Sequence, residues 1–271
     1  MRRIIAVANQ KGGVGKTTTA INLAASLALA DRSVLVVDVD PQANLTSGVG
    51  MRDHIPDGRS IYSALTSVDV EGDLSPYVLH TAVQGLDIVP ADRNLTGAEI
   101  EMVGLLAREQ RLRRLLRPLA ERYNYVFIDC PPSLGLLTLN ALVAADSVLI
   151  PLHCEYFALE GLAELISTMR RVRAALNPSL DIEGVLLTMY DERTNLGQQV
   201  GRDVRAFFKE KTYSTVIPRN VRLGEAPSHG MPVALYDPKS KGAESYLALA
   251  REFIGRHAPA PVAPPPAAAH H

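Results

Sequence analysis

The chain has 271 residues, of which 47% are hydrophobic, so it is long and apolar enough for one large α/β domain with a sizeable core. Its formal net charge at pH 7 is −1, which excludes a globally basic nucleic-acid binder and requires any such binding to come from a local patch. The two cysteines, Cys130 and Cys154, form neither a C-x-x-C motif nor a disulfide framework, so a reducing, cytoplasmic setting is expected. No apolar stretch reaches the roughly 18 residues of a membrane span, so no such span is expected.

The first predicted element is an apolar strand over residues 4–8, which begins too near the N-terminus to leave room for a signal peptide or a preceding helix-turn-helix domain. A predicted helix over residues 19–27 follows, and the loop between them is Lys11-Gly12-Gly13-Val14-Gly15-Lys16-Thr17-Thr18. This context suits a phosphate cradle, because backbone N–H groups converge on an anion at a helix N-terminus. Lys16 is expected to reach the β- and γ-phosphates, and the Thr17 hydroxyl to ligate Mg²⁺. A glycine turn that binds nothing is the alternative, but turn chemistry alone does not call for Gly-Lys-Thr here.

A second apolar run over residues 34–37 predicts a parallel strand covered on both faces. It ends in Asp38-Val39-Asp40-Pro41-Gln42. Because ligands bind beyond the carboxyl ends of such strands, Asp38 and Asp40 are candidate site residues. Their spacing alone is also compatible with two acids in a solvated loop.

The next part of the chain is mixed in composition. Residues 44–80 predict only a short helix near residues 61–65, and residues 86–90 predict a short strand. Residues 99–119 carry apolar side chains at helical spacing and predict one helix. The opposite face of this helix is predicted to be either a solvated surface or a contact with DNA or a partner, and it holds Arg108, Arg111, Arg113, Arg114 and Arg117.

Residues 125–129 form an apolar run that ends in Asp129 and resembles a Walker B strand, whose carboxylate holds Mg²⁺ through water. Cys130 is interpreted as a small buried residue. His153 and Cys154 are adjacent, but they lack further ligands at zinc spacing, so we expect no metal centre there.

The remaining segments continue the alternation of strands and helices, which predicts a mostly parallel twisted sheet with helices on both faces. Residues 1–257 are predicted to form a single domain. Residues 258–271 are rich in Ala and Pro and are expected to be disordered, and the final histidines are compatible with a tag remnant. The predicted helices cover residues 134–145, 159–176, 196–211 and 243–256, and the predicted strands cover residues 147–152, 182–190 and 214–218.

Nearly the whole chain resembles the ParA/MinD family of ATPases with a deviant P-loop, or Walker A, motif. The usual P-loop has a glycine where this chain has Gln10, and Lys11 opens the loop instead. Within the family, the chain resembles the chromosomal ParA (Soj-type) partition ATPases. The blocks that carry this resemblance are residues 8–13, 38–42, 129–135, 155–161 and 217–230, of which the last distinguishes partition ATPases from MinD.

The resemblance implies a P-loop NTPase fold with ATP and Mg²⁺ as cofactors. It implies a cycle in which ATP closes a homodimer, the dimer binds DNA without sequence preference, and a ParB-type centromere-binding protein stimulates hydrolysis at the nucleoid. Lys11, Lys16 and Asp40 are the implied catalytic residues, and Lys11 is expected to contact the partner subunit's phosphates.

The resemblance and the residues together give three sets of site residues. The metal site is expected to involve Thr17, Asp38 and Asp129. DNA is expected to bind Arg222 first, then Arg193, with Arg219 able to serve either DNA or the nucleotide. The nucleotide is expected to bind Lys11, Gly12, Gly13, Val14, Gly15, Lys16, Thr17 and Thr18, with adenine near Met189, Pro218 and Asn220.

Two other functions stay open. A MinD-like positioning ATPase cycles on membranes, but MinD ends in a basic amphipathic helix where this chain has its Ala/Pro-rich tail. A metabolic synthetase that shares the P-loop fold would transfer phosphoryl groups to a small acceptor. The nitrogenase iron protein is excluded, because it needs a cluster cysteine shortly after the Walker B strand, where this chain has Ser133, Leu134 and Gly135.

Overall fold

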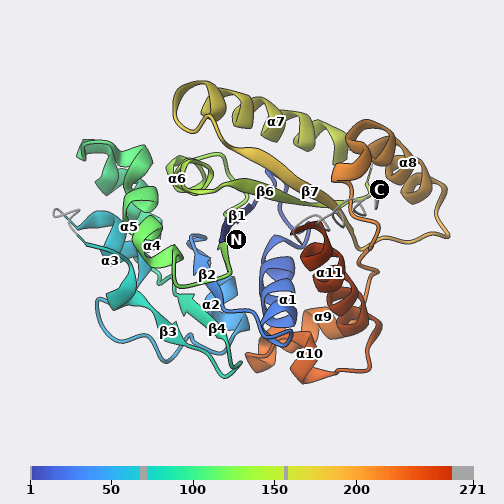
Figure 1. Cartoon of the computed structure of the whole chain (residues 1–271), viewed down its shortest axis with the longest axis horizontal. Coiled ribbons are helices and arrows are strands. Elements are labelled where there is room, and N and C mark those ends of the chain that lie inside the picture. Colours follow the sequence, from blue (N-terminus) through green and yellow to red (C-terminus); the bar gives the residue numbers. More distant parts are fainter. Residues whose placement is uncertain (1, 68–71, 156–157, 258–271) are drawn as a thin grey trace, which may run out of the picture.

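The strands form one sheet that runs through the centre of the molecule (Figure 1). The computed structural model describes residues 2–67, 72–155 and 158–257, so the predicted tail over residues 258–271 lies outside the described residues. The seven strands stand in the order β3-β4-β2-β5-β1-β6-β7, and all neighbours are parallel except β3 and β4. Their bounds are β1 (Arg3–Val7), β2 (Val34–Asp38), β3 (Leu79–His80), β4 (Leu86–Val89), β5 (Tyr125–Asp129), β6 (Ser147–His153) and β7 (Asp181–Thr188).

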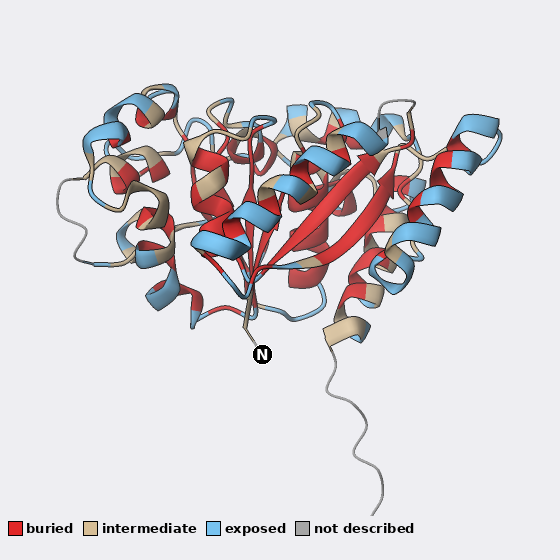
Figure 2. Ribbon diagram, turned by 90° about the horizontal axis from the view of Figure 1, so that it is seen from above, coloured by how far each residue is buried: buried red, intermediate tan, exposed pale blue. Residues whose placement is uncertain are grey.

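Helices cover both faces of the sheet, as the alternation of elements predicts. Along β1, Ile4 and Ala6 belong to one core cluster and Ile5 and Val7 to the other, because successive side chains of a strand point to opposite faces. Figure 2 shows the buried strands between helices whose outer surfaces are exposed. The first cluster packs under α5 (Arg111–Ala120), α6 (Leu136–Ala144) and α7 (Ala158–Ala175), and the second packs under α1 (Lys16–Ala28) and α11 (Lys241–His257).

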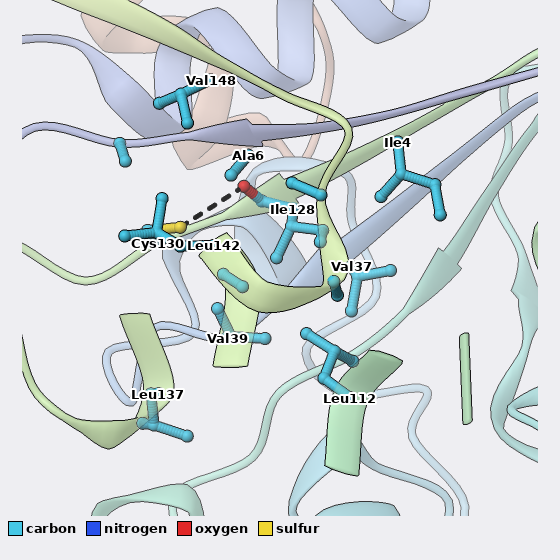
Figure 3. Packing of buried hydrophobic residues seen from close by; sticks show 14 of the residues in the cluster. Ile4, Ala6, Val37, Val39, Leu112, Ile128, Cys130, Leu137, Leu142 and Val148 are labelled. Carbon is cyan, nitrogen blue, oxygen red and sulfur yellow. Dashed lines mark hydrogen bonds between the residues drawn. The ribbon is translucent and has the colours of Figure 1, made fainter. Parts of the chain in front are cut away.

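The first core cluster contains Cys130, a buried free cysteine as predicted (Figure 3). Its thiol donates to the Ile128 carbonyl oxygen at 3.7 Å. No helix within the described ranges combines the length and the apolar character needed to cross a bilayer.

The register of the parallel strands aligns two of the predicted site residues. Val7 of β1 stands opposite Asp129 of β5, and Asp129 stands opposite Asp38 of β2. Because the three strands are parallel, their carboxyl ends meet at one edge of the sheet. The loops that follow β1, β2 and β5 therefore surround the same space.

The prediction of one helix over residues 99–119 is wrong. Two helices, α4 (Leu95–Glu101) and α5, stand there, separated by short 3₁₀ turns over residues 102–104 and 108–110. The break lies at Leu105, which is extended, and at Ala107, whose φ is +51°. The apolar residues still recur at helical spacing because α4 and α5 each bury one apolar face in the core.

The basic face predicted on this segment is also partly wrong, because Arg111 is buried. Its guanidinium donates to the carbonyl oxygens of Leu65 and Ser67, which ties α5 to the end of α3 (Ile61–Thr66). Arg111 therefore satisfies buried backbone acceptors and is not available to a partner.

The predicted strand over residues 214–218 is wrong as well. Only isolated bridges occur here among the described residues: Thr212, just before the segment, pairs with Val185 of β7, and Pro218 pairs with Tyr190, beyond the end of β7. The N–H groups of Ser214 and Thr215 instead donate to the Glu252 carboxylate on α11, both at 2.8 Å. The remaining helices that the structure describes are α2 (Asn44–Gly48), which follows β2, α8 (Asn195–Phe208), which precedes residues 214–218, and α9 (Val221–Glu225) and α10 (Val233–Tyr236), which follow them. Of these, only α8 was expected.

Candidate nucleotide-binding site

A cavity of about 440 Å³ lies where the predicted phosphate loop meets the carboxyl edge of the sheet. Helix α1 begins at Lys16, directly after Gly15, whose φ of +85° is a left-handed conformation that suits glycine. Gly13 has the same requirement, with a φ of +71°. No side chain in the described part of the chain caps the N-terminus of α1, so its first N–H groups are available to receive an anion.

Two lysines of the loop occupy different places. Lys16 is buried, and its ammonium donates to the Lys11 carbonyl oxygen at 3.0 Å. Burial lowers the pKa of Lys16, and the neighbouring Asp129 opposes this shift. The side chain of Lys11 points elsewhere and forms an ion pair with Glu155, the second residue after β6.

The loop is also held by groups that the sequence did not single out. The Thr188 hydroxyl, at the end of β7, donates to the Val14 carbonyl oxygen at 2.8 Å. Asn9 accepts from the Lys11 N–H at 3.0 Å and donates to the Pro151 carbonyl oxygen of β6 at 2.8 Å. Thr188 lines the cavity, and only its position at a strand end signals this role.

Asp38 has its carboxylate fully engaged within the protein. It accepts from the Thr46 N–H at 2.9 Å, from the Thr46 hydroxyl at 2.7 Å and from the Asp40 N–H at 3.2 Å. Burial raises the pKa of Asp38 to about 6, while the hydrogen bonds from Thr46 oppose the rise. Asp38 therefore fixes the loop that carries Asp40, and its role in metal binding stays a prediction.

Asp129 is different, because both of its carboxylate oxygens are buried and neither has a hydrogen-bond partner among the described residues. Burial, reinforced by Asp38, raises the pKa of Asp129 well above its usual value. The Thr17 hydroxyl is close enough to lower the pKa of Asp129, although it makes no hydrogen bond of normal geometry with the carboxylate. These oxygens together fit Mg²⁺, a hard cation that takes oxygen ligands and usually keeps several waters. Within the described part of the chain, no group of three or more His, Cys, Asp or Glu side chains is placed to hold a metal.

The unpartnered carboxylate of Asp129 leads to a stability prediction. In the absence of Mg²⁺, Asp129→Asn should raise the melting temperature by a few degrees, because it removes a carboxylate whose charged form is disfavoured by burial and by the neighbouring Asp38. With Mg²⁺-ATP, the same variant should gain less thermal stabilisation than the wild type. Differential scanning fluorimetry with and without Mg²⁺-ATP measures both effects, and a variant that is less stable than the wild type without metal would contradict the first.

Asp40 lines the cavity next to this candidate metal position. It is buried, and one carboxylate oxygen accepts from the Gln42 N–H at 2.9 Å, which orients the side chain. Gln42 and Asn44 line the cavity beside it. A carboxylate in this position is able to orient a water molecule.

The far side of the cavity contains the three residues predicted near adenine. Met189, Pro218 and Asn220 all line it, together with Leu223. Met189 has a φ of +48°, and the Asn220 side chain caps α9 by accepting from the Arg222 N–H at 3.0 Å. The structure thus brings together most of the predicted phosphate and base residues around one space, whereas Lys11 and Val14 do not line it.

The three arginines predicted to bind DNA differ in their contacts. Arg193 forms an ion pair with Asp191 at 2.8 Å. Arg222 is shared between Glu225 at 2.7 Å and Asp237 at 3.2 Å. Arg219 lines the cavity, and no ion pair of its side chain occurs among the described residues. Of the three, Arg219 therefore lies at the candidate nucleotide site.

A family profile and the curated relatives of this chain point to the same family. A family profile described as an AAA domain matches residues 2–182. The chain is 57% identical over 257 residues to the chromosome partitioning protein ParA of Myxococcus xanthus, covering 95% of this chain and 89% of that protein. It is 56% identical over 252 residues to the sporulation initiation inhibitor protein Soj of Bacillus subtilis, covering 93% of this chain and 98% of that protein.

The fold has a counterpart among solved structures. Cobyrinic acid a,c-diamide synthase from Mycobacterium smegmatis, with bound ADP and magnesium, matches with a TM-score of 0.79 and 38% identity, over 95% of each chain. The two lysines of the glycine loop, the parallel sheet and these similarities agree over most of the chain. The chain therefore belongs to the ParA/MinD family of P-loop ATPases with a deviant Walker A motif, within which it resembles the chromosome-partitioning ParA and Soj proteins.

Proposed function

We propose that this chain is a DNA-partition ATPase that dimerises with ATP, binds DNA without sequence preference, and hydrolyses ATP when a ParB-type partner stimulates it. The observation that carries the proposal is the glycine loop with Lys11 and Lys16, at an uncapped helix N-terminus and beside the unpartnered Asp129. The similarity to ParA and Soj over more than nine-tenths of the chain supports the partition role. Such a protein works in the cytoplasm on the nucleoid, and residues 1–257 form its single ATPase domain.

Nucleotide binding assigns a task to each part of the loop. The N–H groups at the start of α1 receive the phosphates, and Lys16 leaves the Lys11 carbonyl oxygen to contact the β- and γ-phosphates. Thr17 and Asp129 would hold Mg²⁺, directly or through water, and the bound ion would supply positive charge beside the phosphate oxygens. Met189, Pro218 and Asn220 enclose the adenine.

Hydrolysis requires a positioned water and a second cation. Asp40 orients the water, since it is held in the cavity by the Gln42 N–H and has its loop fixed by Asp38. Lys11 contacts the phosphates of the partner subunit, and two-fold symmetry makes this contact reciprocal. A cation delivered across the interface stabilises the transferring group as an arginine finger does, and links dimerisation to the γ-phosphate.

Retention of the full-length protein on immobilised, non-specific DNA with ATP, with ADP and without nucleotide tests the proposal. We expect the protein to be retained on DNA with ATP but not with ADP or without nucleotide, and light scattering should show a shift from monomer to dimer under the same condition. Phosphate contacts should make the retention fall steeply with salt and depend little on sequence. Absence of ATP-dependent retention, combined with ATP-dependent binding to anionic liposomes, would instead indicate a MinD-like membrane cycle.

A metabolic function is a second candidate, because the structural similarity to a cobyrinic acid a,c-diamide synthase extends over 95% of both chains. Such an enzyme would transfer a phosphoryl group to a small acceptor, whereas the proposed ATPase transfers it to water. Measuring ATP turnover with DNA, and then with candidate carboxylate acceptors, separates the two. Turnover that depends on a small acceptor and ignores DNA would overturn the partition proposal.

The DNA contact is proposed to centre on Arg222, with Arg193 next. Arg222→Glu should lose DNA retention while keeping ATP-dependent dimerisation, because a phosphate-binding cation is replaced by an anion. The matched control is Glu225→Gln, which breaks the same ion pair but leaves the arginine charge, and should retain or strengthen DNA binding. Filter binding at physiological salt measures the DNA affinity of both variants. Wild-type affinity in Arg222→Glu would show that the DNA-binding surface lies elsewhere, for example at the arginines of α5.

A further inference from the structure

Lys11 is held by its own subunit at two points. Its backbone N–H donates to Asn9, which is fixed to β6 through the Pro151 carbonyl oxygen. Its side-chain ammonium forms an ion pair with Glu155, which follows β6. Strand β6 therefore determines the position of both ends of Lys11.

Glu155 is itself oriented by a second contact. Its other carboxylate oxygen lies 2.9 Å from Nδ1 of His153, a side chain that is only 14% exposed. The hydrogen bond from Lys11 is the largest cause that lowers the pKa of Glu155, and Arg219 contributes in the same direction. With one oxygen on His153 and the other on Lys11, the carboxylate is positioned to receive the lysine.

This arrangement competes with the role proposed for Lys11. The Lys11 ammonium is directed toward the Glu155 carboxylate of its own subunit, with which it pairs. To reach the phosphates of a partner, Lys11 has to leave Glu155. The Glu155 carboxylate then still contacts His153 and still has the positive charge of Arg219 nearby. Breaking the ion pair with Lys11 therefore does not leave the negative charge of Glu155 without a neighbouring cation.

We propose that Glu155 is a positioning residue that retains Lys11 in the nucleotide-free monomer and thereby raises the ATP concentration at which the protein dimerises. The inference rests on the proposed function, in which Lys11 acts across the dimer interface. The ion pair is partly exposed, at 34% for the Lys11 side chain and 46% for Glu155, so it opposes dimerisation modestly and reversibly. A dimer held by two γ-phosphate contacts overcomes it, whereas an ADP-bound monomer keeps it.

The ion pair itself is tested without any dimer. Trace acetylation of the nucleotide-free full-length protein, followed by mass spectrometry, measures the reactivity of Lys11 relative to the exposed Lys241. Glu155→Gln should raise the relative rate for Lys11 about two- to fivefold, the range expected for a partly exposed ion pair. The matched control is Glu160→Gln, on the first turn of α7, which removes the same charge from an exposed position and should leave the rate unchanged.

The effect on dimerisation is measured on the same three proteins by light scattering during an ATP titration. The concentration of ATP at half-dimerisation should fall about two- to fivefold in Glu155→Gln and stay at the wild-type value in Glu160→Gln. ATP affinity measured in the monomer at low protein concentration should be equal in all three, which a general disturbance of the loop would not produce.

The outcomes separate this inference from the proposed function. Equal Lys11 reactivity in the wild type and in Glu155→Gln, or a half-dimerisation concentration that is unchanged or higher in that variant, overturns the role of Glu155. In that case ATP-dependent dimers of the wild type still support the partition ATPase. A wild-type protein that never dimerises with ATP overturns both, whatever the acetylation shows.

Discussion

Replacing Lys16 with alanine is expected to abolish ATP binding, with a dissociation constant that rises by about 100-fold or more. Charge-assisted hydrogen bonds to phosphate are about twice as strong as neutral ones, and Lys16 is the cation placed at the start of α1 to make them. In the nucleotide-free protein its ammonium has only the Lys11 carbonyl oxygen as a described hydrogen-bond partner. Isothermal titration calorimetry with Mg²⁺-ATP measures the loss.

Stability provides the control for this variant. Burial lowers the pKa of Lys16, which means that folding disfavours the charged form at neutral pH. Removing the charge should therefore leave the melting temperature of the nucleotide-free protein unchanged or slightly higher. Wild-type ATP affinity in Lys16→Ala would overturn the assignment of the phosphate loop, and Lys11→Ala, which should still bind ATP, is the matched comparison.

Asp40→Ala is expected to bind ATP normally but to hydrolyse it at least about 100-fold more slowly, because a positioned acid–base group contributes about 10²–10⁴ in rate. The variant should therefore remain as an ATP-bound dimer on DNA. Asp38→Ala is the contrasting change, since it removes the acceptor for Thr46 and for the Asp40 N–H and should lower the melting temperature as well. Phosphate release and scanning fluorimetry distinguish the two, and normal partner-stimulated turnover in Asp40→Ala would contradict the role of Asp40.

Mixing two inactive variants tests whether Lys11 acts across the interface. A heterodimer of Lys11→Ala and Asp40→Ala subunits contains one site with an intact Asp40 and a Lys11 donated by the other subunit. Some partner-stimulated hydrolysis should return on mixing. If heterodimers form but remain inactive, the role of Lys11 across the interface is wrong.

The sequence predicted the parts of the fold that depend on local patterns. Continuous apolar runs identified β1, β2 and β5 as buried parallel strands, and the acids at the ends of β2 and β5 proved to stand opposite one another. The glycine loop was predicted with its neighbours because left-handed glycines, a following helix and Lys16 are all encoded within a few residues.

The remaining features depend on contacts between distant segments. The helical period over residues 99–119 gave no sign of the extended Leu105, since apolar residues at that spacing fit two short helices as well as one long one. Residues 214–218 have the composition of a strand, but Glu252, on a helix near the end of the chain, accepts two of their N–H groups. Thr188 and Glu155 reach the glycine loop from more than a hundred residues away and have no local signature there.

The place of β1 in the sheet has a consequence for how the protein is synthesised. The register joins Arg3 to Tyr125 and Ile5 to Ser147, so β1 is a central strand whose two neighbours are translated more than a hundred residues after it. At about 5–20 residues per second, the wait is on the order of ten seconds. During translation, an apolar strand and the glycine loop attached to it remain unpaired until roughly half of the chain has emerged. Nascent chains of this protein should therefore need chaperone protection early, and acquire their nucleotide site only after the segments that contain Thr188 and Asn220 have also emerged.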